Sequence, residues 1–169
     1  MDAERAREFL LTLPHAVETQ QWGDNLVFWV GDKRIGGKMF ALLDLSGGTM
    51  HGVIAYSAGP ERATELLERD GLFPAPYLAR AHWVAAEKWS ALRNSEWEEE
   101  LRAANAIIYN KLPPKTRDIL ALPAKAQTKL IADRKKVLAE KACVEADAKA
   151  KAKVSKASAG AKKKRQTAK

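Results

Sequence analysis

The clearest chemical signal in this chain is a run of nine cations near its C-terminus. Beyond the last acidic residue, Asp147, all charged residues are basic: Lys149, Lys151, Lys153, Lys156, Lys162, Lys163, Lys164, Arg165 and Lys169. Cations this close together repel one another unless a polyanion neutralises them. Each phosphate that a lysine neutralises releases a condensed counterion, which favours binding. The run therefore predicts contact with the phosphate backbone of DNA or with another polyanion.

The positive charge is confined to one end of the chain. Residues 1–122 carry 14 Lys and Arg against 17 Asp and Glu, a net charge of −3. Residues 123–169 carry 15 against 4, a net charge of +11. Lysine dominates this second part, and it is a compact charge suited to sequence-neutral phosphate contact rather than to paired readout of guanine. We expect weak, salt-sensitive binding without sequence preference.

Two groups of residues in the first part are further candidates for phosphate contact. Lys33, Arg34 and Lys38 lie within residues 31–38, which also hold three glycines, as a flexible wing that approaches phosphate would. An ordinary solvated hairpin tip, which we favour, has the same composition. Arg80 could grip a phosphate, and Trp83 could stack on a base. For Trp83 we favour a place in the core, and for His82 a pairing with backbone.

No pattern in the sequence indicates an enzyme. His15, His51 and His82 lie in separate segments without the spacing of metal ligands. Cys143 is the single cysteine, which excludes an internal disulfide and a cysteine-based metal site. No nucleophile elbow, glycine-rich phosphate loop or HExxH motif is present. We expect no catalytic residue, no metal and no cofactor.

Targeting signals are also lacking. Charged residues stand where a secretory signal needs an apolar run, and no stretch approaches the ~20 apolar residues of a membrane span. We therefore expect a cytoplasmic protein without a membrane partner.

The first half predicts a helix followed by strands. Ala3–Leu13 has helical apolar spacing, with Asp2 as N-cap and Pro14 as the stop. A turn at residues 22–25 precedes three apolar runs, which we expect to be strands: Leu26–Val30, Lys38–Leu45 and Gly52–Tyr56. The connections between these runs are short, so an antiparallel meander is expected.

The second half predicts mainly helices. A helix opens at Pro60 and ends near Arg69, and a loop at 71–77 leads to a strand at His82–Glu87. A long helix follows, capped by Ser95 with Glu98 as its capping-box partner, and Pro113 ends it. Its apolar face is predicted to consist of Trp97, Leu101, Ala104, Ile107, Ile108 and Leu112. A short helix is expected from about Lys115 to Leu122.

The last part divides in two. Residues 123–153 favour a helix with one narrow apolar stripe, made of Leu130, Ile131, Val137, Leu138 and Val144. Residues 154–169 are rich in Ser, Ala, Gly and Lys, which predicts disorder.

The expected sheet has an unusual pattern, because both faces of Leu26–Val30 and of Phe40–Leu43 are apolar. One face of a two-layer sheet is normally solvated and polar. The second face is therefore either covered or a contact surface. The stripe of residues 123–153 and a second protomer are two candidate covers; alternatively, the central strands of a small sheet are simply apolar.

Four segments resemble the MmcQ/YjbR family of small bacterial proteins, in the family's order and spacing. They are Leu13–Glu18 (LPHAVE, beside an LPGAEE-like opening), Gly37–Leu43 (GKMFALL), Tyr77–Val84 (YLARAHWV) and Tyr109–Arg117 (YNKLPPKTR). The resemblance implies an α+β fold with one antiparallel sheet and helices packed on one face. It also implies a double-wing protein described as DNA-binding, with no catalytic residues. Residues 31–37 are longer than the family hairpin, and the lysine-rich tail is no family feature.

Together these observations predict an α+β domain at residues 1–122, a helical extension at 123–153 and a disordered basic tail at 154–169. The expected function is non-enzymatic, weak and sequence-nonspecific nucleic-acid binding by the tail and the basic hairpin. The alternative is a protein-interaction or chaperone-like module, or a homodimer, that uses the apolar sheet face or the tail helix. Attachment to an anionic membrane surface ranks last, because no aromatic face or lipid anchor accompanies the lysines.

Overall fold

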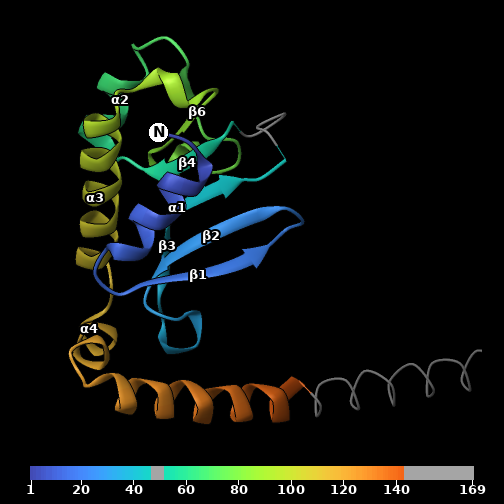
Figure 1. The fold of residues 1–169 in the computed structure, drawn as a ribbon. Coiled ribbons are helices and arrows are strands. Elements are labelled where there is room, and N and C mark those ends of the chain that lie inside the picture. The colour runs from blue at the N-terminus through green and yellow to red at the C-terminus, as the bar shows by residue number, and fades with distance from the viewer. Residues whose placement is uncertain (47–51, 143–169) are drawn as a thin grey trace, which may run out of the picture. The chain divides into compact units, whose positions relative to one another are not determined.

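The computed structural model describes residues 1–46 and 52–142, and they form an α+β fold around one six-stranded antiparallel sheet (Figure 1). The strand order is β1-β2-β3-β4-β6-β5. The strands are β1 (Ala16–Gln21), β2 (Asn25–Val30), β3 (Lys38–Asp44), β4 (Ile54–Ser57), β5 (Leu72–Pro74) and β6 (Trp83–Ala86). The predicted fold class is confirmed. The chain divides into two units, Met1–Gln127 and Thr128–Lys169, and the predicted bounds of the three segments stay predictions.

The predicted meander is confirmed, but both edges of the sheet were missed. β1 was not predicted, because AVETQQ is too polar to stand out as a strand. Its polar side chains are tolerated because it is an edge strand, with β2 on one side only. The expected loop at 71–77 contains β5, the other edge strand. Pro74 is compatible with that position, since an edge strand has backbone groups that need no ladder partner.

A bulge in β3 decides which residues face the helices. Phe28 pairs with Ala41 and Trp29 pairs with Met39, so Phe40 is an additional residue in β3. Phe40 and Ala41 are both fully buried despite being neighbours. A bulge changes the alternation of side chains along a strand. Simple period-two reading of KMFALLD therefore assigns some of these residues to the wrong face.

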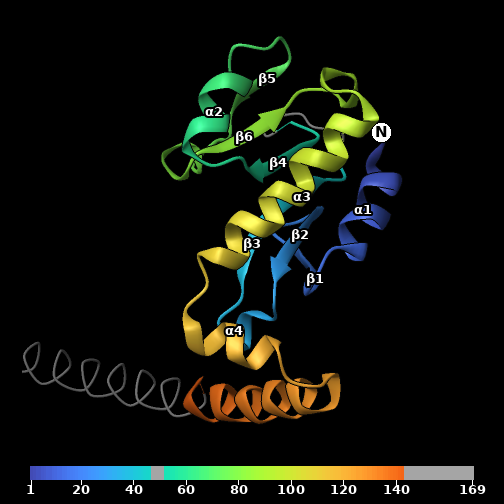
Figure 2. The ribbon, with the colours of Figure 1, turned by 90° about the vertical axis from the view of Figure 1, so that its left-hand side faces the viewer.

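Helices cover one face of the sheet, as predicted: α1 (Ala3–Thr12), α2 (Pro60–Leu66) and α3 (Asn94–Asn110). A further helix, α4 (Pro114–Leu120), packs against the connection between β2 and β3. Long α3 crosses β3 and β4, and α1 lies against β1 (Figures 1 and 2). The predicted apolar face of α3 faces the sheet: Trp97, Leu101 and Ala104 are fully buried. The Trp97 ring meets Tyr56 of β4 edge-on, with centroids 6.0 Å apart.

The predicted start of α2 at Pro60 is confirmed, and one of the two predicted N-caps is correct. The Asp2 carboxylate caps α1 by accepting a hydrogen bond of 2.9 Å from the Arg5 backbone N–H. The start of α3 was wrong: the N-cap is Arg93, not Ser95. The Glu96 carboxylate accepts a hydrogen bond of 2.7 Å from the Arg93 backbone N–H. Glu96 takes this role rather than Glu98 because it is the N3 residue of a helix capped at Arg93. Glu96 also pairs with Arg69, a contact from outside the helix.

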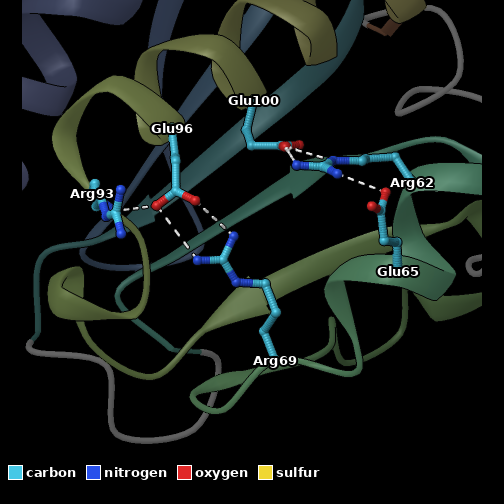
Figure 3. A network of polar contacts seen from close by, with 6 residues as sticks. All are labelled: Arg62, Glu65, Arg69, Arg93, Glu96 and Glu100. Atoms are coloured by element: carbon cyan, nitrogen blue, oxygen red, sulfur yellow. Dashed lines mark hydrogen bonds and ion pairs between the residues drawn. The ribbon is translucent and has the colours of Figure 1, made fainter.

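An ion-pair network fastens the α2 region to α3 (Figure 3). Arg62 of α2 pairs with Glu100 at 2.6 Å and with Glu65 at 2.6 Å. Arg69 pairs with Glu96 at 2.9 Å. The hydrogen bond from Arg69, followed by that from the Arg93 backbone, lowers the pKa of Glu96. The hydrogen bond to Glu100 raises the pKa of Arg62 above its usual range, so Arg62 and Glu96 stay charged at neutral pH.

Residues 124–142 are helical, in agreement with the predicted extension as far as the structure describes it. Three residues of the predicted stripe are exposed large apolar side chains: Leu130, Val137 and Leu138. Val144, Cys143, the rest of the predicted helix to 153 and the predicted disorder at 154–169 lie outside the described residues.

Candidate functional site

The predicted wing at residues 31–38 is not a flexible, free loop. Lys33–Ile35 form a short 3-10 turn, and Gly36 follows in the left-handed region with φ of 94°. Ile35 is buried, and its carbonyl accepts a hydrogen bond of 3.3 Å from the Thr116 hydroxyl of α4. A Cβ at Gly36 would come within 2.7 Å of that hydroxyl oxygen. The glycine therefore serves close packing against α4 rather than flexibility.

The three cations of this hairpin all lie against groups of the chain itself. Arg34 pairs with the Asp32 carboxylate at 3.1 Å. Lys38 Nζ donates a hydrogen bond of 2.9 Å to the Lys111 carbonyl oxygen. The ammonium of Lys33 lies 5.7 Å from the centroid of the Trp29 ring. All three side chains remain exposed, but each charged group already interacts with a neighbouring group of the fold.

In the region around Arg80, the structure shows which side chains are buried in the core and which could contact a nucleic acid. Trp83 is 4% exposed in the core, so its side chain offers no surface to a base. His82 has φ of 59°, and its carbonyl oxygen accepts a hydrogen bond of 3.1 Å from the Ala58 N–H. Arg80 lies in a 3-10 turn, Ala79–Ala81, and is exposed. His82 is also exposed, and Arg80 presents an accessible charged group.

The helix at 124–142 presents a second set of exposed cations. Lys125, Lys129, Arg134, Lys135, Lys136 and Lys141 are all exposed, with Asp133 and Glu140 as the acids of the segment. No ion pair joins these cations to an acid within residues 1–46 and 52–142. The predicted phosphate contacts of the tail, Lys149, Lys151, Lys153, Lys156, Lys162, Lys163, Lys164 and Arg165, lie outside the described residues.

The apolar strands left open whether the second face of the sheet is covered, and the structure shows that part of it is. Over β4, β5 and β6 it packs under the chain's own β5–β6 connection: Ala75 and Trp83 cluster with Ala55 and Ala85, and Leu78 packs against them. Neither the tail stripe nor a second protomer is needed to bury that half of the face. Sequence reasoning missed this cover because the connection is short and irregular.

Beside this cover the same face holds an open pocket of about 320 Å³, hereafter the open-face pocket. Its described lining comes from the β1–β2 turn, strands β2, β3 and β4, and the β5–β6 connection: Trp22, Asn25, Met39, Leu42, Ala55, Ala75, Pro76, Tyr77 and Leu78. Every one of these residues is uncharged. Pockets of this size and character are the usual places for small organic groups to bind.

Two aromatic residues of the open-face pocket are unusual in conformation and exposure. Trp22 has φ of 54° and is 63% exposed; Tyr77 has φ of 63° and is 92% exposed. Large side chains rarely adopt this left-handed region. The sequence identified residues 22–25 only as a turn. The sequence did contain one sign of this site: a tryptophan stands next to glycine in a tight turn, where a small residue is expected.

The described residues contain neither a metal-binding cluster nor a membrane-spanning helix. No three His, Cys, Asp or Glu side chains gather there as a metal site requires. No helix of residues 1–46 and 52–142 has both the length and the apolarity to cross a bilayer. His51 and Cys143 lie outside the described residues.

The fold and its pocket define a small α+β protein with a six-stranded antiparallel sheet, helices on one face and a partly covered second face. A family model described as YjbR matches residues 11–105, so the chain belongs to the YjbR family. The crystal structure of a Deinococcus radiodurans protein with a DUF419 domain is similar, with 26% identity and a TM-score of 0.62. That match covers 72% of this chain and 89% of the other. The comparison with curated proteins found no match.

Proposed function

We propose that this protein binds nucleic acid weakly and without sequence preference, as a cytoplasmic protein with no reaction of its own. The observation that carries the proposal is the division of charge, +11 on residues 123–169 against −3 on residues 1–122. Phosphate is the polyanion chemistry that closely spaced lysines match best. The exposed cations of the helix at 124–142 support the proposal, since no acid of the described residues neutralises them.

The hairpin has a smaller part in this proposal than the tail. Arg34 and Lys38 are engaged by Asp32 and the Lys111 carbonyl, so they contribute orientation rather than most of the affinity. Arg80, exposed on the β5–β6 connection, is the better placed of the body's candidate cations. A family resemblance to proteins described as DNA-binding agrees with the proposal but does not carry it.

A salt titration of duplex binding tests the proposal. If about five lysines engage duplex DNA, log K falls with log salt with a slope near −4 to −5. Deleting residues 148–169 should remove most of that slope. A matched chain of full length, with the cations of 148–169 changed to Gln, should behave like the deletion. A truncated chain that keeps both its affinity and its slope would exclude the tail.

A second candidate function is a protein-interaction module. It is favoured by the exposed apolar side chains of the helix at 124–142, since Val137 is 41% and Leu138 is 51% exposed. Exposed apolar side chains on one segment often mark a contact surface. A concentration-dependent dimer that Leu130→Asp with Leu138→Asp abolishes would support this function. A monomer that binds duplex DNA of any sequence would support the first.

A further inference from the structure

We propose that the open-face pocket receives one unpaired base of a single-stranded nucleic acid. The inference rests on the proposed function, nucleic-acid binding. It assigns to the folded domain a contact that the tail does not provide. The tail would attract any polyanion, whereas the pocket would distinguish a strand with free bases from a duplex. This gives the folded domain a role of its own in binding.

The lining of the open-face pocket specifies a flat, uncharged group. Met39, Leu42 and Leu78 offer apolar contact, and no described lining residue carries a charge. A phosphate or sugar placed there would lose its hydration without ionic compensation. A nucleobase ring has two apolar faces and carries its polar atoms only at its edge. The pocket therefore suits the base and leaves the phosphate outside it.

The rim supplies surfaces on which a base can stack. Trp22 is 63% and Tyr77 is 92% exposed, so their rings are accessible to a ligand. Aromatic side chains that stack on successive bases are the common element of single-strand binding sites, and they tolerate any base. In a duplex each base is already stacked on its neighbours, so no base face is free to stack on the rings of Trp22 and Tyr77. The pocket thus favours unpaired bases.

The backbone at the rim supports a functional role for these aromatic residues. Trp22 and Tyr77 adopt left-handed conformations, with φ of 54° and 63°. Glycine would adopt them without strain, as neighbouring Gly23 does at φ of 81°. Large residues held in such conformations occur preferentially at binding sites. Burial cannot account for them either, because both side chains are mostly exposed.

Polar groups at the pocket match the remaining parts of a nucleotide. Asn25 Nδ2 donates a hydrogen bond of 2.9 Å to the Trp22 carbonyl oxygen. Its Oδ1 is shielded from water and has no donor among the described residues. A ring N–H at the edge of a base could supply that donor once a neighbouring side chain turns aside. Arg80, three residues after Tyr77, is exposed and offers a charge to the phosphate outside.

The test compares three ligands of equal length with the full chain at one salt concentration: oligothymidylate, the same sugar-phosphate strand without bases, and a duplex. Fluorescence anisotropy should show oligothymidylate binding about fivefold or more tightly than the abasic strand, the gain from one stacked base. Trp22→Gly with Tyr77→Gly should remove this difference and leave duplex affinity unchanged. Tyr109→Ala, on α3 and outside the pocket, is the matched aromatic control.

Loss of fold does not explain the expected result, because both glycines relieve a left-handed backbone. The double variant should melt at the same temperature as the parent chain or higher, while losing its preference for bases. Equal affinity for oligothymidylate and the abasic strand would overturn the inference and leave the proposed function intact. Free thymidine competing as well as the oligonucleotide would overturn it in favour of a small-molecule site. No binding to any of the three would overturn both proposals.

Discussion

Lys38 Nζ donates a hydrogen bond of 2.9 Å to the backbone carbonyl oxygen of Lys111, 73 residues further along the chain. Lys38 begins β3, and Lys111 is the C-cap of α3. The last carbonyls of a helix lack partners within the helix, and a cation there also favours the helix dipole. A lysine that the sequence suggested for phosphate contact therefore connects the sheet to its main helix.

Lys38→Met should lower the free energy of unfolding by about 1 kcal/mol, because it removes a charged hydrogen bond at a helix end. Duplex affinity should change little, since this ammonium is engaged within the fold. Urea unfolding and a DNA titration measure the two effects. Lys33→Met is the matched control, because the ammonium of Lys33 lies near a ring rather than a carbonyl. Affinity lost without loss of stability would assign Lys38 to the nucleic acid.

Arg62→Met should destabilise the fold by about 2 kcal/mol. The Glu100 side chain is only 7% exposed, and the change leaves its carboxylate without its guanidinium partner. Adding Glu100→Gln should restore part of the loss, because the buried charge is then removed as well. Glu65→Gln is the control: that carboxylate is 67% exposed and should cost little. Chemical unfolding of the parent chain and the three variants measures these differences. A double variant no more stable than Arg62→Met would contradict the role given to the ion pair of Arg62 and Glu100.

Acid should weaken the contact between the Arg69 segment and α3. The hydrogen bond from Arg69, and then that from the Arg93 backbone, lowers the pKa of Glu96 in the folded state. A lowered pKa adds stability at a pH above the ordinary Glu value, and this stability is lost as pH falls through the folded value. Thermal melting between about pH 6 and pH 2 should show a decline that Glu96→Gln flattens. Identical profiles for the two chains would argue against this ion pair.

Tyr56→Phe should stabilise the protein by about 1 kcal/mol. The Tyr56 hydroxyl is buried and has no hydrogen-bond partner among the described residues. Burial, and then the charge of Glu100, raises the pKa of Tyr56 above its usual range, so the group is neutral. Removing a buried unpaired hydroxyl recovers its desolvation cost while the ring keeps its packing against Trp97. Tyr109→Phe, at a half-buried site, should leave the melting temperature unchanged; a lower value for Tyr56→Phe would reveal a partner for the hydroxyl.

The sequence alone predicted the features that depend on neighbouring residues. The Asp2 cap, the apolar face of α3 and the meander from Leu26 onward follow from local spacing, and the structure confirms them. The edge strands β1 and β5 escaped prediction, because an edge strand tolerates polar residues and proline and so carries little pattern. Trp83 was expected in the core, and it lies there.

The sequence by itself also determined the division of charge, since composition needs no fold. Only the tertiary structure decided what each face of the sheet contacts. The additional Phe40 of β3 changes the alternation, and residues 75–83 return over half of the second face. Such packing depends on residues far apart in the chain, which no local pattern records. For the same reason, the exposure of Trp22 and Tyr77 became visible only in three dimensions.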